Sequence, residues 1–377
     1  MRVLSLRLKD FRNIPELDLS AAPGVNVIYG DNGQGKTNLI EGMWLCSGSK
    51  SFRGAALPQM IAFKKPCAEI SMAFEGFGRE QKTELRLFRQ SGAEKAEKQP
   101  ATLNGVKKRS LNALSGTFCA VAFSPAQTEL INGGPEERRR FIDCAISQIR
   151  PYYSDLIYKY NRTLFHRNSL LRAENPERDL MAVWNESLAG FGASIINYRR
   201  KYIKLLNPQA AGFYSGLFGG SENLEISYQS IFKQDERELV ENFDLKTVAA
   251  LYRKKLDEGL EEDRRLGFTS TGVHRDDIGL KIDARSAKQY SSQGQKRSAV
   301  LALKLAESAI LKNSIGEEPV IFLDDVLSEL DFKRQRYILS RFEGKQVFIT
   351  CCDRTACDAL FGRKIFFMHG GTLQVEL

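Results

Sequence analysis

Residues 30–37 read GDNGQGKT and directly follow the apolar run GVNVIY at residues 24–29. The eight residues match the pattern GxxxxGK[ST], and the apolar run predicts a buried strand that leads into a loop. The glycines allow backbone N–H groups to curl around phosphates, and the helix expected to start near Thr37 adds a partial positive charge. The stretch therefore predicts a phosphate-binding loop between a strand and a helix.

The residue types in this loop suggest separate tasks. Lys36 is expected to reach the β- and γ-phosphates and to act in catalysis, and Thr37 to offer its hydroxyl to Mg²⁺. ATP and Mg²⁺ are accordingly the expected cofactors. The nucleotide-contacting residues expected here are Gly30, Asp31, Asn32, Gly33, Gln34, Gly35, Lys36, Thr37 and Asn38.

A second apolar run, VIFL at residues 320–323, ends in the acids Asp324 and Asp325. Two acids at the carboxyl end of a buried strand fit a Mg²⁺ ligand, Asp324, and a catalytic group that polarises the attacking water, Asp325. Two surface acids that close a strand are the simpler alternative. The next residues, SELD at 328–331, resemble the D-loop of ABC ATPases, and the 288 residues between Lys36 and Asp324 exclude a compact kinase or a small GTPase.

Residues 290–295, YSSQGQ, open a predicted helix before this acidic motif. They resemble the LSGGQ signature of ABC ATPases, with Gln293 where a glycine is usual. Ser292, Gly294 and Gln295 at a helix N-terminus would form an anion site without a lysine. In this superfamily such a site serves the γ-phosphate bound by the other subunit, so the motif implies a homodimer that closes on ATP. A plain N-cap serine would explain the same residues.

The composition indicates a folded protein with a polyanionic partner. Hydrophobic residues make up 42% and charged residues 27%, with a formal net charge of +9. No run approaches the roughly 20 apolar residues that cross a bilayer, and the first residues lack a signal-peptide core, so we expect a cytoplasmic protein without a membrane partner. The seven cysteines lack CxxC spacing, which favours reduced thiols over disulfides or zinc.

The pattern along the chain changes twice. Residues 67–106 alternate apolar and polar positions and contain the turn Asn104-Gly105, which predicts a small antiparallel meander. Apolar residues at heptad spacing over 184–205 predict a long helix that closes at Asn207-Pro208. A preceding helix, separated from it by residues 174–176, would complete an antiparallel helical arm.

These segments predict an α/β fold: an ABC-type P-loop ATPase head with an antiparallel β-subdomain and a helical, coiled-coil-like insertion. Residues 320–323 and 346–349 are expected to be central parallel strands. The expected domains are an N-terminal ATPase segment at 1–130, a helical arm at 131–268 and a C-terminal ATPase segment at 269–377.

Further segments spread over nearly the whole chain resemble the RecF family of SMC-like ATPases. Phe11-Arg12-Asn13 is similar to a phosphate-contacting element of SMC-like heads, which implies that Arg12 contacts the nucleotide. Gln127 stands near the position of the lid glutamine of the family, and Thr350 stands where a switch histidine would follow the strand at 346–349. The other segments that carry the resemblance are FSP at 123–125, GGPEERRRFID at 133–143, GVHRDD at 272–277, SSQGQ at 291–295 and LDDVLSELD at 323–331.

The resemblance implies an ATP-dependent DNA-binding protein of recombinational repair and replication restart. Such a protein binds single- and double-stranded DNA at gaps or junctions, dimerises on ATP, has a weak DNA-stimulated ATPase activity and helps RecO and RecR to load RecA. The densest basic clusters, Arg138–Arg140 and Arg199–Lys201, are candidates for DNA contacts, although a solvated helix face explains each cluster as well.

Two other functions compete with this interpretation. The first is the ATP-binding subunit of an ABC transporter, which would need contacts to a membrane domain, whereas the insertion here is basic and heptad-like. The second is the head of a DNA-end nuclease of the SMC family proper, for which the insertion at residues 131–268 is too short.

Overall fold

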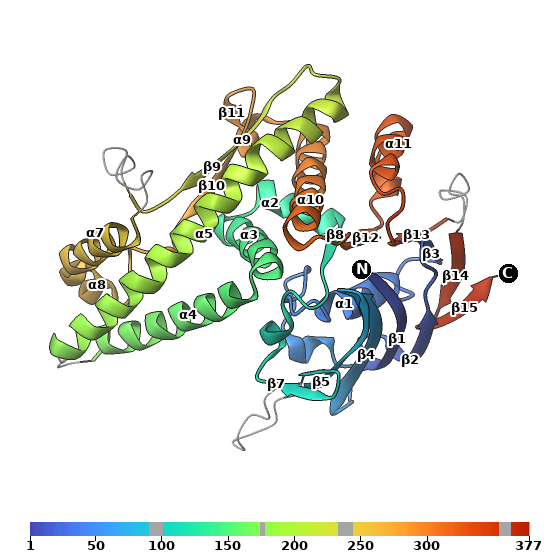
Figure 1. Ribbon diagram of the computed structural model, residues 1–377, viewed down its shortest axis with the longest axis horizontal. Helices are drawn as coiled ribbons and strands as arrows, with labels where there is room; N and C mark the ends of the chain where they lie inside the picture. Colours follow the sequence, from blue (N-terminus) through green and yellow to red (C-terminus); the bar gives the residue numbers. More distant parts are fainter. Residues whose placement is uncertain (90–100, 174–177, 233–243, 354–362, 377) are drawn as a thin grey trace. The chain divides into compact units, whose positions relative to one another are not determined.

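The computed structural model describes residues 1–89, 101–173, 178–232, 244–353 and 363–376 (Figure 1). The chain divides into two compact units, one of Met1–Thr128 with Val300–Leu377 and one of Glu129–Ala299. Residues 269–299, which we expected in the C-terminal ATPase segment, thus lie in the same unit as the helices. The reason is that β10 (Asp277–Ile282) pairs with β9 (Leu224–Gln229) along its whole length.

The first unit contains a six-stranded sheet in the order β15-β14-β3-β13-β12-β8. Its strands are parallel except for β15, and β12 and β13 are buried along their whole length because both faces of a parallel sheet are covered. The expected central strands are thereby confirmed. The bounds are β3 Val25–Tyr29, β8 Ala120–Phe123, β12 Val320–Asp324, β13 Val347–Cys351, β14 Arg363–His369 and β15 Thr372–Glu376.

The same unit carries an antiparallel sheet in the order β2-β1-β4-β5-β6-β7. Asn104 and Gly105 have φ of 51° and 77°, as a tight hairpin turn requires, so the predicted meander is confirmed. The bounds are β1 Arg2–Phe11, β2 Ile14–Ser20, β4 Cys67–Gly76, β5 Arg79–Phe88, β6 Ala101–Leu103 and β7 Val106–Lys108.

The register of this sheet brings several strand ends together. Lys9 of β1 lies opposite Glu69, Cys67 of β4 lies opposite Phe88, and Lys108 of β7 lies opposite Ala101. The ends of β1, β5 and β7 and the start of β4 are therefore at one end of the sheet. We call it the Arg12 end, because the turn from β1 to β2 contains Arg12.

Helices and short 3-10 turns complete the first unit. The helix α1 packs against β1 of the antiparallel sheet and against β12 and β13 of the parallel sheet, so that it joins the two sheets. The bounds are α1 Lys36–Leu45, η1 Leu57–Met60, η2 Leu111–Leu114, η3 Pro125–Thr128, η4 Leu327–Glu329 and α11 Phe332–Ser340, and α10 spans Gln293–Ile315 across the boundary between the units.

The second unit is mainly helical, and α4 packs along α5 as the predicted arm requires (Figure 1). The predicted loop at 174–176 lies outside the described residues. The predicted helix end at Asn207-Pro208 is wrong, because α5 continues through Pro208 to Phe218 and buries Tyr214 and Leu217 beyond it. The bounds are α2 Glu129–Asn132, α3 Pro135–Ile149, α4 Pro151–Leu171, α5 Arg178–Phe218, α7 Leu245–Glu258, α8 Leu260–Leu266, β11 Arg285–Ser286 and α9 Ala287–Tyr290.

A buried arginine holds these helices together. The guanidinium of Arg167 on α4 donates to Asn185 of α5, to Asp263 of α8 and to Thr269, each at 2.7 Å. Arg167 is 0% exposed and Asp263 is 1% exposed, so each charge depends on the other for compensation. In the part of the chain that the structure describes, no helix is both long enough and apolar enough to span a membrane.

Candidate nucleotide-binding site

The loop between β3 and α1 has the curled backbone that the glycines were predicted to allow. Gly30, Gly33 and Gly35 have φ of 150°, 81° and 116°, a region in which side chains are strained. A Cβ on Gly30 would also lie 2.2 Å from the carbonyl oxygen of Met368 on β14. Gly35 is the N-cap of α1, so the loop ends at the positive end of that helix.

Lys36 is folded back over this loop. Its ammonium donates to the carbonyl oxygens of Gly30 at 2.5 Å and Asp31 at 2.9 Å, and the residue is 7% exposed. The positive charge is therefore held where the loop would surround a phosphate.

The two predicted acids lie beside the loop, where β12 ends. The Thr37 hydroxyl donates to Oδ1 of Asp324 at 2.9 Å, so the two expected Mg²⁺ ligands are adjacent. Burial raises the pKa of Asp324, while hydrogen bonds from Thr350 and Thr37 act in the opposite direction. A hydroxyl and a buried carboxylate are oxygen donors of the kind that Mg²⁺ prefers, so these residues fit the ion.

Thr350, at the position of the expected switch residue, connects the two acids. Its hydroxyl donates to Oδ1 of Asp324 at 2.8 Å and accepts from the backbone N–H of Asp325 at 3.0 Å. Asp325 has a φ of 53°, and the Ser328 hydroxyl donates to its carboxylate at 3.1 Å. Thr350 therefore holds the carboxylate of Asp324 and the backbone of Asp325.

Replacing Thr350 by valine should lower the kcat for ATP hydrolysis by roughly 10- to 100-fold, the cost of losing a buried hydrogen bond to a charged group. Valine keeps the shape of threonine, but it cannot hold either acid. The KM for ATP should change much less than kcat, because the loop around Lys36 is untouched. Steady-state kinetics would show this split.

Thr350→Ser is the matched control, because serine restores the hydroxyl and should recover most of the kcat. A serine variant as slow as the valine variant would mean that the methyl group, and not the hydroxyl, is what matters.

Arg12 approaches the site from the turn between β1 and β2. Its Nε donates to Glu41 at 2.6 Å, whereas its Nη2 is buried and has no hydrogen-bond partner among the described residues. An unpaired buried guanidinium nitrogen carries a desolvation cost that an anion would relieve. The arginine thus fits a phosphate, as its sequence context implied.

Three nearby residues were missed in the sequence. Glu41 is fully buried and accepts from Arg12 and Ser51, and Arg53 donates to Asn38 at 2.9 Å and lies 3.9 Å from Glu41. The signal for Glu41 was present, because a charged residue stands among apolar residues in α1. Arg53 and Ser51 lie in a loop whose pattern carried no comparable signal.

Side chains from distant segments fasten the outer part of the loop. Asn13 donates to the carbonyl oxygen of Gly33 at 2.9 Å and accepts from Asn38 at 2.7 Å. Gln34 accepts backbone N–H groups from Gly370 at 2.6 Å and Gly371 at 3.0 Å. Asn32 accepts from the thiol of Cys352 at 3.1 Å.

Gln127, which stands near the position of the lid glutamine of the family, makes a local contact. It donates to the carbonyl oxygen of Ala122 at 2.8 Å, near the end of β8.

The signature segment begins α10 in the second unit. The backbone N–H of Ser292 donates to Gln295 at 2.8 Å, and the N–H of Gln295 donates to the Ser292 hydroxyl at 3.2 Å. This reciprocal pair of hydrogen bonds is a capping box. Ser292 therefore caps the N-terminus of α10, as the alternative interpretation of the sequence predicted. Ser292 and Gly294 remain exposed, and a Cβ on Gly294 would have its nearest neighbour 4.0 Å away.

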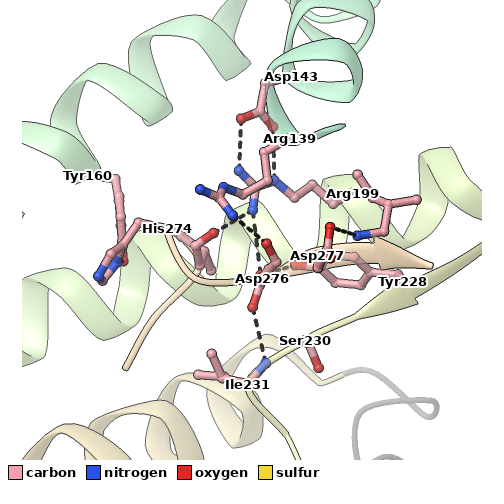
Figure 2. Close-up of polar contacts among 12 residues, drawn as sticks. Arg139, Asp143, Tyr160, Arg199, Tyr228, Ser230, Ile231, His274, Asp276 and Asp277 are labelled. Carbon is pink, nitrogen blue, oxygen red and sulfur yellow. Dashed lines mark hydrogen bonds and ion pairs between the residues drawn. The ribbon is translucent and has the colours of Figure 1, made fainter. Parts of the chain in front are cut away.

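Arg139 and Arg199, one residue from each basic cluster expected to contact DNA, have partners inside the second unit (Figure 2). Arg199 donates to both carboxylate oxygens of Asp143, at 2.8 and 2.9 Å, and lies 3.5 Å from Asp276. Arg139 donates to the backbone carbonyl of Asp276 at 2.6 Å. Arg138 and Arg140 are paired in the same unit with Asp277 and Glu137. These four arginines have protein partners, which argues against their role in DNA contacts.

The GVHRDD segment is part of the same network and not a free surface loop. His274 contacts the Tyr160 hydroxyl at 2.8 Å and the carbonyl oxygen of Thr269 at 3.0 Å, and burial lowers its pKa to about 4. Burial also raises the pKa of Asp276 to about 6. The uncharged histidine and its partners hold α4 against the segment before β10.

A family model described as the RecF/RecN/SMC N terminal domain matches residues 2–368. The chain belongs to this family. The "DNA replication and repair protein RecF" of Alkaliphilus oremlandii is 39% identical over 93% of each chain. The protein of the same name from Symbiobacterium thermophilum is 39% identical over 94% of this chain and 92% of its own.

The solved structures confirm the fold class. A structure of the recombination mediator protein RecF with ATP in the RecFOR pathway has a TM-score of 0.90 and 34% identity, and it covers all of this chain and 98% of that chain. An Smc head bound to the C-terminal winged-helix domain of ScpA has a TM-score of 0.55 at 13% identity, over all of this chain and 97% of that chain, and shows a shared fold only. The ABC-type ATPase head with a β-subdomain and a helical insertion is therefore the fold of this RecF-family chain.

Proposed function

We propose that the chain is an ATP-dependent DNA-binding protein of recombinational repair and replication restart. In this proposal it dimerises on ATP, has a weak DNA-stimulated ATPase activity, and helps RecO and RecR to load RecA at single-stranded gaps. The observation that carries the proposal is the Thr37–Asp324 contact of 2.9 Å beside the phosphate-type loop. The relatives of this chain are named for DNA replication and repair. These names disfavour the alternative function, an ABC transporter subunit.

The roles of the site residues follow from their chemistry. Lys36 and Arg12 would bind the phosphate oxygens of ATP, together with the N–H groups of the loop. Mg²⁺, held by Thr37 and Asp324, would draw negative charge away from the phosphates. Asp325 would orient and polarise the attacking water, and Thr350 would hold the backbone of Asp325 in place.

The signature segment would complete the site of a second copy. Ser292, Gly294 and Gln295 lie at the start of α10, and the positive end of this long helix favours an anion. We infer that they face the γ-phosphate bound by the other subunit, so that ATP joins two copies.

Asp325→Asn should slow ATP hydrolysis by about 100-fold or more and prolong the ATP-bound dimer, because the water loses its polarising carboxylate. Asp324→Asn should instead weaken the binding of Mg²⁺ and ATP, so that the dimer does not form. Sedimentation with ATP, with ADP and without nucleotide separates the two outcomes, and each variant is the control for the other. Identical behaviour of the two variants would contradict the division of roles.

The function itself is tested by the parent protein. ATP turnover is measured with and without gapped duplex DNA. In a second experiment the protein is mixed with membrane vesicles, and the vesicles are pelleted. We expect faster turnover with DNA and no protein in the pellet. Turnover that ignores DNA, together with binding to membranes, would favour the transporter subunit.

A further inference from the structure

The Arg12 end of the antiparallel sheet carries basic side chains that have no acidic partner in the part of the chain that the structure describes. The register places Lys64 just before β4, and Lys108 and Arg109 at the end of β7, at this same end. Among the described residues, none of these three is in an ion pair or donates a side-chain hydrogen bond; the ammonium of Lys64 lies 5.6 Å from the centre of the Phe63 ring. Asp10, at the same end, is already paired with Lys65 at 3.1 Å.

Two further basic residues extend this surface. Arg89, directly after β5, donates to the backbone carbonyls of Ala62 at 3.2 Å and Ile61 at 3.5 Å, and to no carboxylate of the described residues. Lys50 is exposed in the loop after α1, and Gly48 of that loop is packed against the turn η2 that follows Arg109. We call Lys50, Lys64, Arg89, Lys108 and Arg109 the basic end.

Several basic residues elsewhere on the sheet are paired with carboxylates. Arg2 is paired with Glu75 at 3.2 Å, Arg7 with Glu16 at 2.7 Å, and Lys82 with Glu84 at 2.6 Å. In the second unit, the arginines described above also have carboxylate or carbonyl partners, namely Arg138, Arg139, Arg140, Arg167 and Arg199. At the basic end, a polyanion would find several neighbouring cations that have no carboxylate partner among the described residues.

We propose that the basic end binds the phosphate backbone of DNA. The proposal rests on the proposed function, because it assumes that DNA is the polyanion. No base-reading arrangement is involved: lysine and arginine contacts to phosphates position a protein on DNA without selecting a sequence.

The position of the basic end links DNA to the nucleotide site. The segment that carries Lys64 is fastened to the Arg12 turn on both sides, since Ala62 donates to the carbonyl of Asp10 at 2.9 Å and Arg12 donates to the carbonyl of Met60 at 2.7 Å. DNA held by Lys64 would thus lie on the segment that borders Arg12.

The test uses the full-length chain with Lys64, Lys108 and Arg109 all replaced by glutamine. The matched control makes the same replacement by glutamine at Arg2, Arg7 and Lys82. It removes the same number of positive charges from the same sheet. Affinity for a gapped duplex is measured over a range of salt concentrations, and ATP binding reports whether each protein is folded.

We expect the basic-end variant to bind DNA at least tenfold more weakly, with a dependence of log K on log salt that is shallower by about 2 to 3. The control should keep both the affinity and the slope of the parent. Equal losses in the two triple variants, or an unchanged slope in the first, would overturn the proposal while leaving the proposed function intact. A parent that binds no DNA would overturn both.

Discussion

Replacing Lys36 by arginine is expected to lower the kcat for ATP hydrolysis by about 100-fold or more, the scale measured when one preorganised charge-stabilising donor is lost. The ammonium of Lys36 occupies a closed space between the carbonyls of Gly30 and Asp31. A planar guanidinium keeps the charge but is too large for that space. ATP-driven dimerisation of this variant should also weaken.

The measurement combines ATP turnover, sedimentation with ATP and a thermal melt. Lys159→Arg is the control, since this lysine is exposed, is paired with Asp155 and lies over the Tyr152 ring, away from the loop. The melt of the Lys36 variant should match that of the parent. ATP turnover equal to that of the parent would remove the basis for the phosphate-binding role of the loop.

Replacing Arg167 by methionine is expected to lower the free energy of unfolding of the helical unit by about 3–5 kcal/mol, because the carboxylate of Asp263 would stay buried without its cation. The contacts to Asn185 and Thr269 would be lost at the same time. A loss of this size is a large part of the stability of a typical domain.

Urea unfolding followed by tryptophan fluorescence would measure this change. The chain has two tryptophans, so a Trp44→Phe background leaves Trp184 of the helical unit as the reporter. Arg265→Met is the control, because Arg265 and Glu262 form an exposed pair one helical turn apart, and its midpoint should equal that of the background protein. An unchanged midpoint for the Arg167 variant would show that the buried pair contributes no net stability.

The parts of the fold that the sequence predicted correctly rest on local patterns. The phosphate-type loop, the strand before Asp324 and the Asn104-Gly105 turn each combine a residue type with its immediate neighbours. The Smc head shares the fold at only 13% sequence identity, so most residues of such a head can change while the fold is kept. Local patterns of this kind are what a single sequence reveals.

The features that the sequence did not reveal depended mostly on contacts formed only on folding. Arg199 appeared as a free cation until folding placed Asp143 and Asp276 beside it. Pro208 appeared as a helix end, but α5 gains enough burial beyond it to continue, with Tyr214 fully enclosed. Arg53 acquired its position near Glu41 through a loop, and loop geometry is not encoded in periodicity.

The backbone of Asp325 limits which amino acids could stand at that position. With φ at 53°, the residue lies in the left-handed region, which glycine enters freely and the short polar residues asparagine and aspartate enter at moderate cost. A glutamate has the same Cβ, but its longer side chain is less able to hydrogen-bond to the local backbone, so it would meet more of the steric penalty. Among the residues that tolerate this conformation well, aspartate alone carries a negative charge, so the turn after β12 itself selects the acid.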